Sequence, residues 1–328
     1  MTAQAVQAAV LATPHLARVK PAPVGHHSSG FAPPWSPQFH PVTLVVVLVV
    51  IGLYMTLTRG ESKPTTGQRF EFATSMVALL IAGSWPVEDL AAHWSLTALI
   101  VQRLLLVLVV APMLLWSIPA PLAAKLTKPR LMDTLLQYLS RPAVAVVVFT
   151  AIAVGTLLTP VVAAQSSSAG ARTGIDALML ASGIVLWSPV VTAIPGASRP
   201  THLGQAVYLF VQSVIPGFPS IVFIFSHHPL YPGFSHVHEA LHLSPLVDQQ
   251  LAGVIAKVAT LPVLWSAAWV ALSKAQRQDR EGIDADPLTW AEVQRQLERA
   301  ERAERSGRSA AQTEAPGTGG LSGDSHPN

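Results

Sequence analysis

One segment constrains this chain more than any other. The largely apolar run of 23 residues from Leu96 to Ile118 contains a single charged residue, Arg103. As a helix it would be about 35 Å long at roughly 1.5 Å per residue, enough to cross a hydrocarbon core of about 30 Å. Arg103 would then lie roughly 10 Å below one interface, where a charge is costly unless it snorkels, pairs or faces a wet cavity. The segment therefore predicts a membrane helix with a buried arginine that needs a partner.

The composition extends this prediction to the whole chain. Hydrophobic residues make up 50% of the 328 residues and charged residues only 12%, against about 25% charged in soluble proteins. The absence of cysteine excludes disulfides, thiolate metal sites and CxxC redox chemistry. The net charge of +3 comes mostly from basic residues at the ends of apolar segments. They fit sorting against a lipid bilayer better than binding of nucleic acid.

Recurring apolar segments predict an all-α polytopic bundle of about seven transmembrane helices within residues 42–273. The predicted spans are 42–58, 70–85, 96–118, 142–165, 175–195, 205–226 and 249–273. We expect an extracytoplasmic N-terminal tail at 1–41, a charged cytoplasmic helix at 274–308 and a disordered tail at 309–328. Trp290, Val293 and Leu297 give the charged helix a thin apolar stripe, which either lies near the headgroups or docks a partner.

The basic residues gather in alternate loops and after the last span. They are Arg59, Lys63, Arg69, Lys125, Lys128, Arg130, Arg141, Arg199, Lys274, Arg277 and Arg280. Because such loops stay in the cytoplasm, the predicted orientation is N-out and C-in. We expect a multi-pass protein of the cell plasma or inner membrane.

This topology predicts an intramembrane polar cluster toward the outer side. Its members are Gln102, Arg103, Asp176, Asp248, Gln249 and Gln250. Arg103 either pairs with Asp176 and locks two helices together, or serves as a charge in a functional cavity. Lys257, inside the last span, has the same two interpretations.

Histidines collect on the same side, five of them around the loop between the last two spans. They are His93, His227, His228, His236, His238 and His242. Neutral imidazole suits copper and zinc, and no thiolate is present, so copper is the candidate metal. The alternative is a polar loop that is rich in histidine and binds no metal.

Five prolines fall within predicted spans: Pro112, Pro189, Pro216, Pro219 and Pro262. Each removes a helical hydrogen bond. They either kink helices that shape the bundle or break helices around a substrate path, as in transporters.

Several motifs carry a resemblance to a known family. They are SLTALIVQRLLL at 95–106, AP at 111–112, PAP at 119–121, SGIVLWSPV at 182–190, FSHHPLYPGF at 225–234 and DQQLAG at 248–253. Together and in this order they resemble the seven-helix CtaG proteins, which are associated with assembly of caa3-type cytochrome c oxidase. The resemblance covers nearly all seven spans and implies oxidase subunits as partners.

The chain departs from the family pattern at three positions. In the family the third span usually reads His-Met-x-Gln-His, whereas here the histidine positions are Leu99 and Arg103 and only Gln102 is kept. The fifth span of the family typically carries a histidine seven residues before the glycine, and that position is Asp176 here. If those histidines bind a metal or heme in the family, this chain has replaced them with what could be an arginine and carboxylate pair.

The function that the resemblance implies is a membrane-integral assembly factor for cytochrome c oxidase that handles copper or helps subunits fold. No nucleophile and base arrangement, phosphate loop or nucleotide site is recognisable, so we expect no enzyme. A small-solute or metal transporter and a membrane scaffold are the alternatives.

Overall fold

The computed structural model describes residues 35–191 and 200–284, and in these residues every regular element is a helix. The chain divides into two units, Met1–Leu272 and Ser273–Asn328. The all-α membrane fold is therefore confirmed. Residues 1–34 of the predicted N-terminal tail, the predicted tail at 309–328 and the stripe at Trp290 lie outside the described residues.

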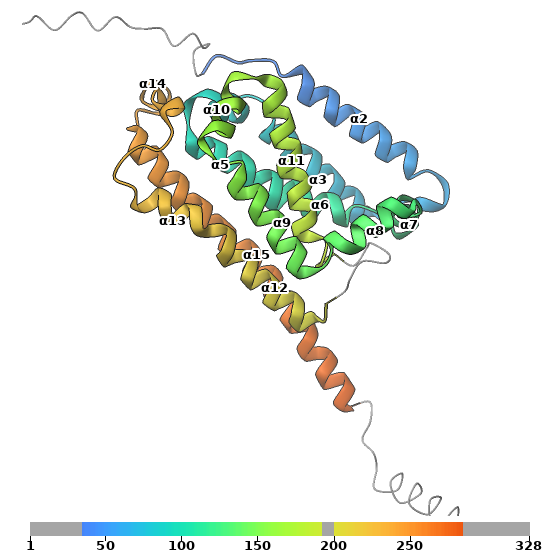
Figure 1. The fold of residues 1–328 in the computed structure, drawn as a ribbon. Coiled ribbons are helices and arrows are strands. Elements are labelled where there is room, and N and C mark those ends of the chain that lie inside the picture. The colour runs from blue at the N-terminus through green and yellow to red at the C-terminus, as the bar shows by residue number, and fades with distance from the viewer. Residues whose placement is uncertain (1–34, 192–199, 285–328) are drawn as a thin grey trace, which may run out of the picture. The chain divides into compact units, whose positions relative to one another are not determined.

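The predicted Arg103 helix forms the centre of the first unit. It consists of α5 (Leu96–Leu104), the π-helical segment η3 (Leu105–Val110) and α6 (Ala111–Trp116). In its most apolar window 61% of the residues are buried, against 17–33% for the other long spans. Figure 1 shows it among α3 (Thr66–Ala82), α9 (Pro142–Gly155) and α11 (Ala169–Trp187), all of which pack together in the first unit.

The remaining helices follow in chain order. They are α2 (Pro41–Leu57), η1 (Gly60–Ser62), α4 (Val87–Asp89), η2 (Leu90–Trp94), α7 (Ala120–Leu126), α8 (Arg130–Leu139), α10 (Thr159–Ser167), α12 (His202–Val214), η4 (Ile215–Gly217), α13 (Phe218–Phe225), η5 (Pro232–Phe234), α14 (Val237–Leu241) and α15 (Pro245–Asp284). Polar caps begin several of them. Thr65 and Gln68 form a capping box at α3, and the Ser95 and Ser168 hydroxyls cap α5 and α11.

Four helices are long and apolar enough to cross a membrane: Leu96–Trp116, Ala169–Trp187, His202–Phe225 and Pro245–Gln278. Two bent pairs raise the number to six, and α2 is a shorter apolar helix of 17 residues. The bent pairs are Thr66–Ala82 with Val87–Trp94, at 48°, and Asp133–Leu139 with Pro142–Gly155, at 85°. The count of seven and the orientation stay predictions.

The fourth predicted span, 142–165, is wrong as a continuous helix. α9 ends at Gly155, and α10 starts a new helix at Thr159. The backbone of Leu158 is extended, and Pro160 stands in the first turn of α10. Proline is tolerated there because its missing N–H would have no helical acceptor. Apolar character alone does not reveal this break.

The prolines occupy three kinds of position. Pro112 lies in the first turn of α6, directly after the π-helical segment, while Pro189 follows the end of α11. Pro216 and Pro219 coincide with the break between α12 and α13. Pro262 alone lies inside an unbroken helix, α15.

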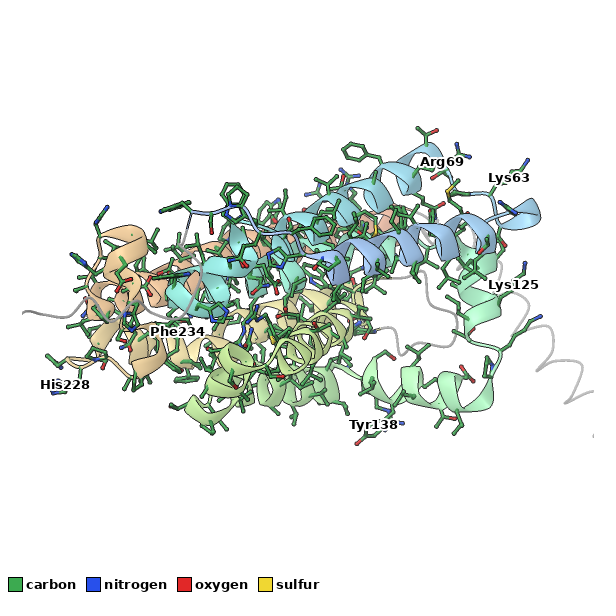
Figure 2. The ribbon with its side chains drawn as sticks, turned by 90° about the horizontal axis from the view of Figure 1, so that it is seen from above. Lys63, Arg69, Lys125, Tyr138, His228 and Phe234 are labelled. Carbon is green, nitrogen blue, oxygen red and sulfur yellow. The ribbon has the colours of Figure 1, made fainter. Side chains whose placement is uncertain are left out.

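The predicted boundary at residue 273 does not interrupt a helix. The second unit begins at Ser273, and its described part is the end of α15, which continues to Asp284. Within the first unit, Figure 2 shows Lys63, Arg69 and Lys125 near one end and His228 and Phe234 near the other. These three basic residues thus lie apart from the histidine loop.

Candidate functional site: a polar network at broken helices

The chain from the start of α3 to the end of η2 is not one straight helix. α3 ends at Ala82, and the short helices α4 and η2 continue the chain to Ser95 at an angle of 48° to α3. Such a break leaves carbonyl groups without helical partners. Gln102 bonds one of them, because its Nε2 donates to the Ala82 carbonyl at 3.0 Å and to Glu88 Oε2 at 3.0 Å. The one polar residue kept from the family motif therefore holds the break together.

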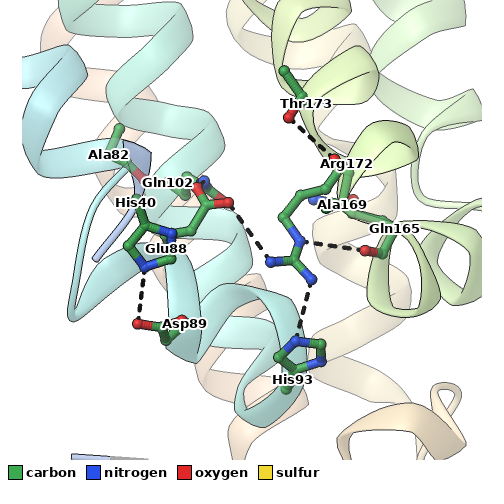
Figure 3. A network of polar contacts seen from close by, with 10 residues as sticks. All are labelled: His40, Ala82, Glu88, Asp89, His93, Gln102, Gln165, Ala169, Arg172 and Thr173. Carbon is green, nitrogen blue, oxygen red and sulfur yellow. Dashed lines mark hydrogen bonds and ion pairs between the residues drawn. The ribbon is translucent and has the colours of Figure 1, made fainter. Parts of the chain in front are cut away.

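Arg172 is the hub of this region, as Figure 3 shows. Its Nη1 lies 3.7 Å from Glu88 Oε1, its Nη2 lies 3.2 Å from His93 Nε2, and its Nε donates to the Gln165 carbonyl at 3.3 Å. The guanidinium thus joins η2, α10 and α11. Its planar set of donors suits several acceptors at once, which a lysine could not match.

A second ion pair completes the network. His40 Nε2, just before α2, lies 3.1 Å from Asp89 Oδ2, and Asp89 is buried. The sequence analysis placed neither His40, Asp89, Glu88 nor Arg172 in the site. A usable signal was present, since Glu88 and Asp89 are the charged residues of the predicted outer loop before the third span, and Arg172 is the charged residue of the predicted outer loop between the fourth and fifth spans.

Arg103 is buried, with 4% of its surface exposed, but it does not form the predicted ion pair with Asp176. Its Nη2 donates instead to the Thr156 carbonyl at 3.1 Å and to Gln165 Oε1 at 3.1 Å. Successive residues of a helix point about 100° apart. Gln102 therefore faces α3 and Glu88, whereas Arg103 faces the break between α9 and α10.

Tyr231 serves the same break from the histidine loop. Its hydroxyl donates to the Leu157 carbonyl at 2.6 Å, next to the carbonyl that Arg103 binds. Burial raises the pKa of the Tyr231 hydroxyl, which Arg103 opposes, so the group stays a neutral donor. Two side chains thus satisfy the carbonyls that the broken span releases.

Two cavities adjoin the network. The acidic cavity, of about 190 Å³, is lined by Glu88, Gln102 and Asp176 together with apolar residues of α2 and α3. Asp176 Oδ1 and Gln102 Oε1 are buried and have no hydrogen-bond partner among the described residues. The basic cavity, of about 110 Å³, is lined by Arg103 and Lys257 and is otherwise largely apolar. Arg103 and Asp176 therefore belong to different cavities.

The three polar residues that open α15 have structural contacts. Asp248 is 1% exposed and accepts from Ser95 Oγ at 2.7 Å and from the Leu96 amide at 2.7 Å, so it caps α5. Gln249 Oε1 accepts from the Leu230 amide at 2.7 Å, and Gln250 Nε2 donates to the Ser226 carbonyl at 3.4 Å. These residues anchor α5 and the histidine loop to α15.

Lys257 likewise has a local role. Its Nζ donates to the Ser213 carbonyl at 3.4 Å and lies against Gly217, at the break between α12 and α13. A cation at the carboxyl end of a helix is favourable because carbonyl groups without partners point toward it. The contact supports the structural interpretation of this lysine.

The predicted histidine site is not assembled in this structure. His236 Nδ1 lies 3.0 Å from Glu239 Oε1, and the His238 and His242 rings meet edge to face with centroids 6.0 Å apart. His93 belongs to the Arg172 network instead. In residues 35–191 and 200–284, no three histidine or carboxylate side chains gather as a metal site. Leu99, at the other family histidine position, is buried in an apolar cluster with Phe223 and Tyr231.

Comparison with known proteins gives one match. The family model described as cytochrome c oxidase caa3 assembly factor matches residues 40–278, nearly the whole described part of the chain. No curated protein and no solved structure matches the chain.

Proposed function

The chain belongs to the family of cytochrome c oxidase caa3 assembly factors, and from this premise we propose that it is a non-enzymatic assembly factor acting at the extracytoplasmic face of the plasma or inner membrane. The family match over residues 40–278 carries the proposal. The matched range contains every side chain of the network around Arg172. A partner that binds beside the network around Arg172 would also contact the histidine loop, because η2 packs against η5 and α14.

Copper is the cargo we propose. The loop at 227–242 carries five histidines and one carboxylate, Glu239, and imidazole suits copper. His238 and His242 stand closest, at either end of α14. Since no third ligand joins them among the described side chains, the remaining ligands would come from a rearranged loop or from the oxidase subunit that receives the ion. A cargo ion needs such an open site, because it must leave again.

The transporter alternative has weaker support. The basic cavity lies inside the bundle and carries Arg103 and Lys257, whose charges repel a metal cation. Copper uptake into proteoliposomes separates the two functions. An assembly factor binds copper at its loop without moving it across the bilayer.

The test is deletion of the gene followed by complementation. We expect the deletion strain to lose caa3 oxidase activity and assembled oxidase in its membranes. The variant His236→Ala/His238→Ala/His242→Ala should restore subunit levels but lower the copper content of the oxidase, and added copper should correct the defect. His202→Ala is the matched control, because His202 lies at the start of α12, outside the loop, beside Gln205.

The two parts of the proposal fail separately. A deletion strain with normal oxidase would contradict the assembly function. Normal copper loading by the triple variant would remove the loop from copper handling and leave the assembly function standing.

A further inference from the structure

A groove opens near the end of the first unit that lies away from the histidine loop (Figure 2). It contains none of the residues that the proposed function invokes. It is lined by residues of α2, of α3 and of the turn between them, and has a volume of about 780 Å³. Three cations line one end: Arg59, Lys63 and Arg69. Figure 2 shows Lys63 and Arg69 near this end. All three are exposed, and no ion pair or side-chain hydrogen bond involves them among the described side chains, which do not include that of Glu61.

The rest of the groove is apolar. Val47 and Ile51 of α2 and Val77 and Leu80 of α3 form its walls. Val47 precedes Arg59 by twelve residues, so the apolar part extends about 18 Å from the cations at roughly 1.5 Å per residue. Cations at one end of a long apolar groove fit a lipid, with its charged headgroup and apolar chains, better than they fit a free anion.

The floor of the groove is fixed. Tyr54 stacks on Phe72 with ring centroids 3.8 Å apart and an interplanar angle of 7°. The Tyr54 hydroxyl donates to the Ser117 carbonyl at 3.0 Å, which ties the floor to the end of α6. Phe72 and Met76 are buried beneath the groove. The cavity is thus part of the packed fold.

The turn that carries two of the cations is fixed as well. Gly60 adopts φ +74°, a conformation that residues with a Cβ rarely adopt. The buried Ser62 hydroxyl lies 3.4 Å from Lys125 Nζ of α7. Arg59 and Lys63 flank this short turn, and both line the groove.

We propose that this groove binds an anionic phospholipid of the surrounding bilayer, with its phosphate at Arg59, Lys63 and Arg69 and one acyl chain along the walls. Basic pockets between membrane helices are suited to such headgroups. Residues 59–69 carry these three positive charges and one negative charge, Glu61, while Glu71 of α3 does not line the groove. Zwitterionic lipids should bind poorly, because their choline or ethanolamine would meet three cations.

The test uses the full-length protein in nanodiscs or detergent and a fluorescent phosphatidylglycerol, with the matching phosphatidylcholine as reference. The charge variant is Arg59→Gln/Lys63→Gln/Arg69→Gln. The matched control, Lys128→Gln/Lys274→Gln/Arg277→Gln, removes the same charge from exposed positions elsewhere. We expect the charge variant to weaken phosphatidylglycerol binding by about tenfold or more and the control by about twofold or less. Binding of phosphatidylcholine should not change.

A second variant, Val77→Trp, tests the apolar part and keeps all three cations. Val77 is 56% exposed, so the larger ring fills the groove without disturbing the core. It should weaken the binding of the two-chain lipid by about tenfold. Glycerol phosphate and inorganic phosphate, at concentrations far above that of the lipid, should not compete.

Three outcomes would overturn the proposal. The first is equal phosphatidylglycerol binding by the charge variant and the wild type. The second is equal loss in the control, which would indicate a general effect of net charge. The third is competition by glycerol phosphate or inorganic phosphate, which would indicate a site for free anions.

Discussion

Arg103 is the residue whose environment is most demanding. It sits in the most buried span, yet its Nε and Nη1 atoms have no hydrogen-bond partner among the described residues, and only Nη2 is bonded. The basic cavity, of about 110 Å³, borders the guanidinium and has room for a polar partner of these two donors. The arginine therefore links the break between α9 and α10 to the basic cavity.

A double-mutant cycle tests this environment. Arg103→Leu removes the donor to Gln165 Oε1, and Gln165→Leu removes the acceptor. We expect a coupling energy of about 1.5 to 3 kcal/mol, typical of a hydrogen bond to a charged group. It is measured from the thermal stability of the single and double variants in detergent. The cycle between Arg103→Leu and Asp176→Leu is the control and should give less than half that coupling, because the two groups line different cavities. A larger coupling to Asp176 would restore the ion pair that the sequence predicted.

Asp248 provides a second test at the level of one side chain. Replacing it by Leu leaves Ser95 Oγ and the Leu96 amide buried without an acceptor. We expect a loss of about 2 to 3 kcal/mol in the free energy of unfolding, whereas Asp248→Asn should cost less because one acceptor oxygen remains. Gln250→Leu is the control, since its bond is long at 3.4 Å. Equal losses for Asp248→Leu and Gln250→Leu would argue against the cap.

Between helices, close contacts depend on small residues. At Gly253 of α15 a Cβ would stand 2.7 Å from the Ser220 carbonyl oxygen and 2.9 Å from Phe223 Cβ, so α13 and α15 touch through this glycine. Small residues allow such approach between membrane helices. At Gly155 of α9 a Cβ would meet nothing within 4 Å.

The two glycines form a matched pair for mutation. Gly253→Ala should lower the free energy of unfolding by about 1 to 3 kcal/mol, because the backbone of α13 must move. Gly155→Ala should be neutral or stabilising by up to about 1 kcal/mol, because alanine favours the helix. Thermal unfolding in detergent compares the two. A Gly253→Ala variant as stable as Gly155→Ala would show that α13 and α15 pack less closely than the structure indicates.

The helices themselves were largely predictable from apolar runs, and their interruptions were not. Residues 42–58 and 96–118 correspond closely to α2 and to the span from α5 to α6. The break at Thr156–Leu158 lies in a segment that is apolar on both sides, so hydropathy does not detect it. The partner of Arg103 was missed for a related reason. The neighbour that each face of α5 meets depends on how the helices pack. Gln102 faces Ala82 and Glu88, whereas Arg103, one residue later, faces Thr156 and Gln165 and not Asp176.

Over the whole first unit, polar chemistry divides between two ends. His228 and Phe234 of the histidine loop lie toward one end, and Lys63 and Arg69 of the lipid groove lie toward the other (Figure 2). The segment η2, which carries His93 of the Arg172 network, packs against η5 and α14 of the histidine loop. This separation fits the uneven distribution of basic residues, which keeps loops rich in lysine and arginine in the cytoplasm. The end that we propose for copper would then face outward.

The orientation of the chain in the membrane decides whether the histidine loop can meet an oxidase subunit at the extracytoplasmic face. A reporter that is active only in the cytoplasm should work when fused after Lys128 or Arg280 and fail after Glu239, because Lys128 lies in a basic loop, Arg280 follows the last span, and Glu239 lies in the histidine loop. A reporter active only outside should give the reverse pattern. Replacing Lys63, Lys125 and Lys128 by Gln should weaken the preference, since these charges hold their loops inside. Cytoplasmic activity after Glu239 would place the histidines on the inner side, and the proposed copper transfer would then need a recipient in the cytoplasm.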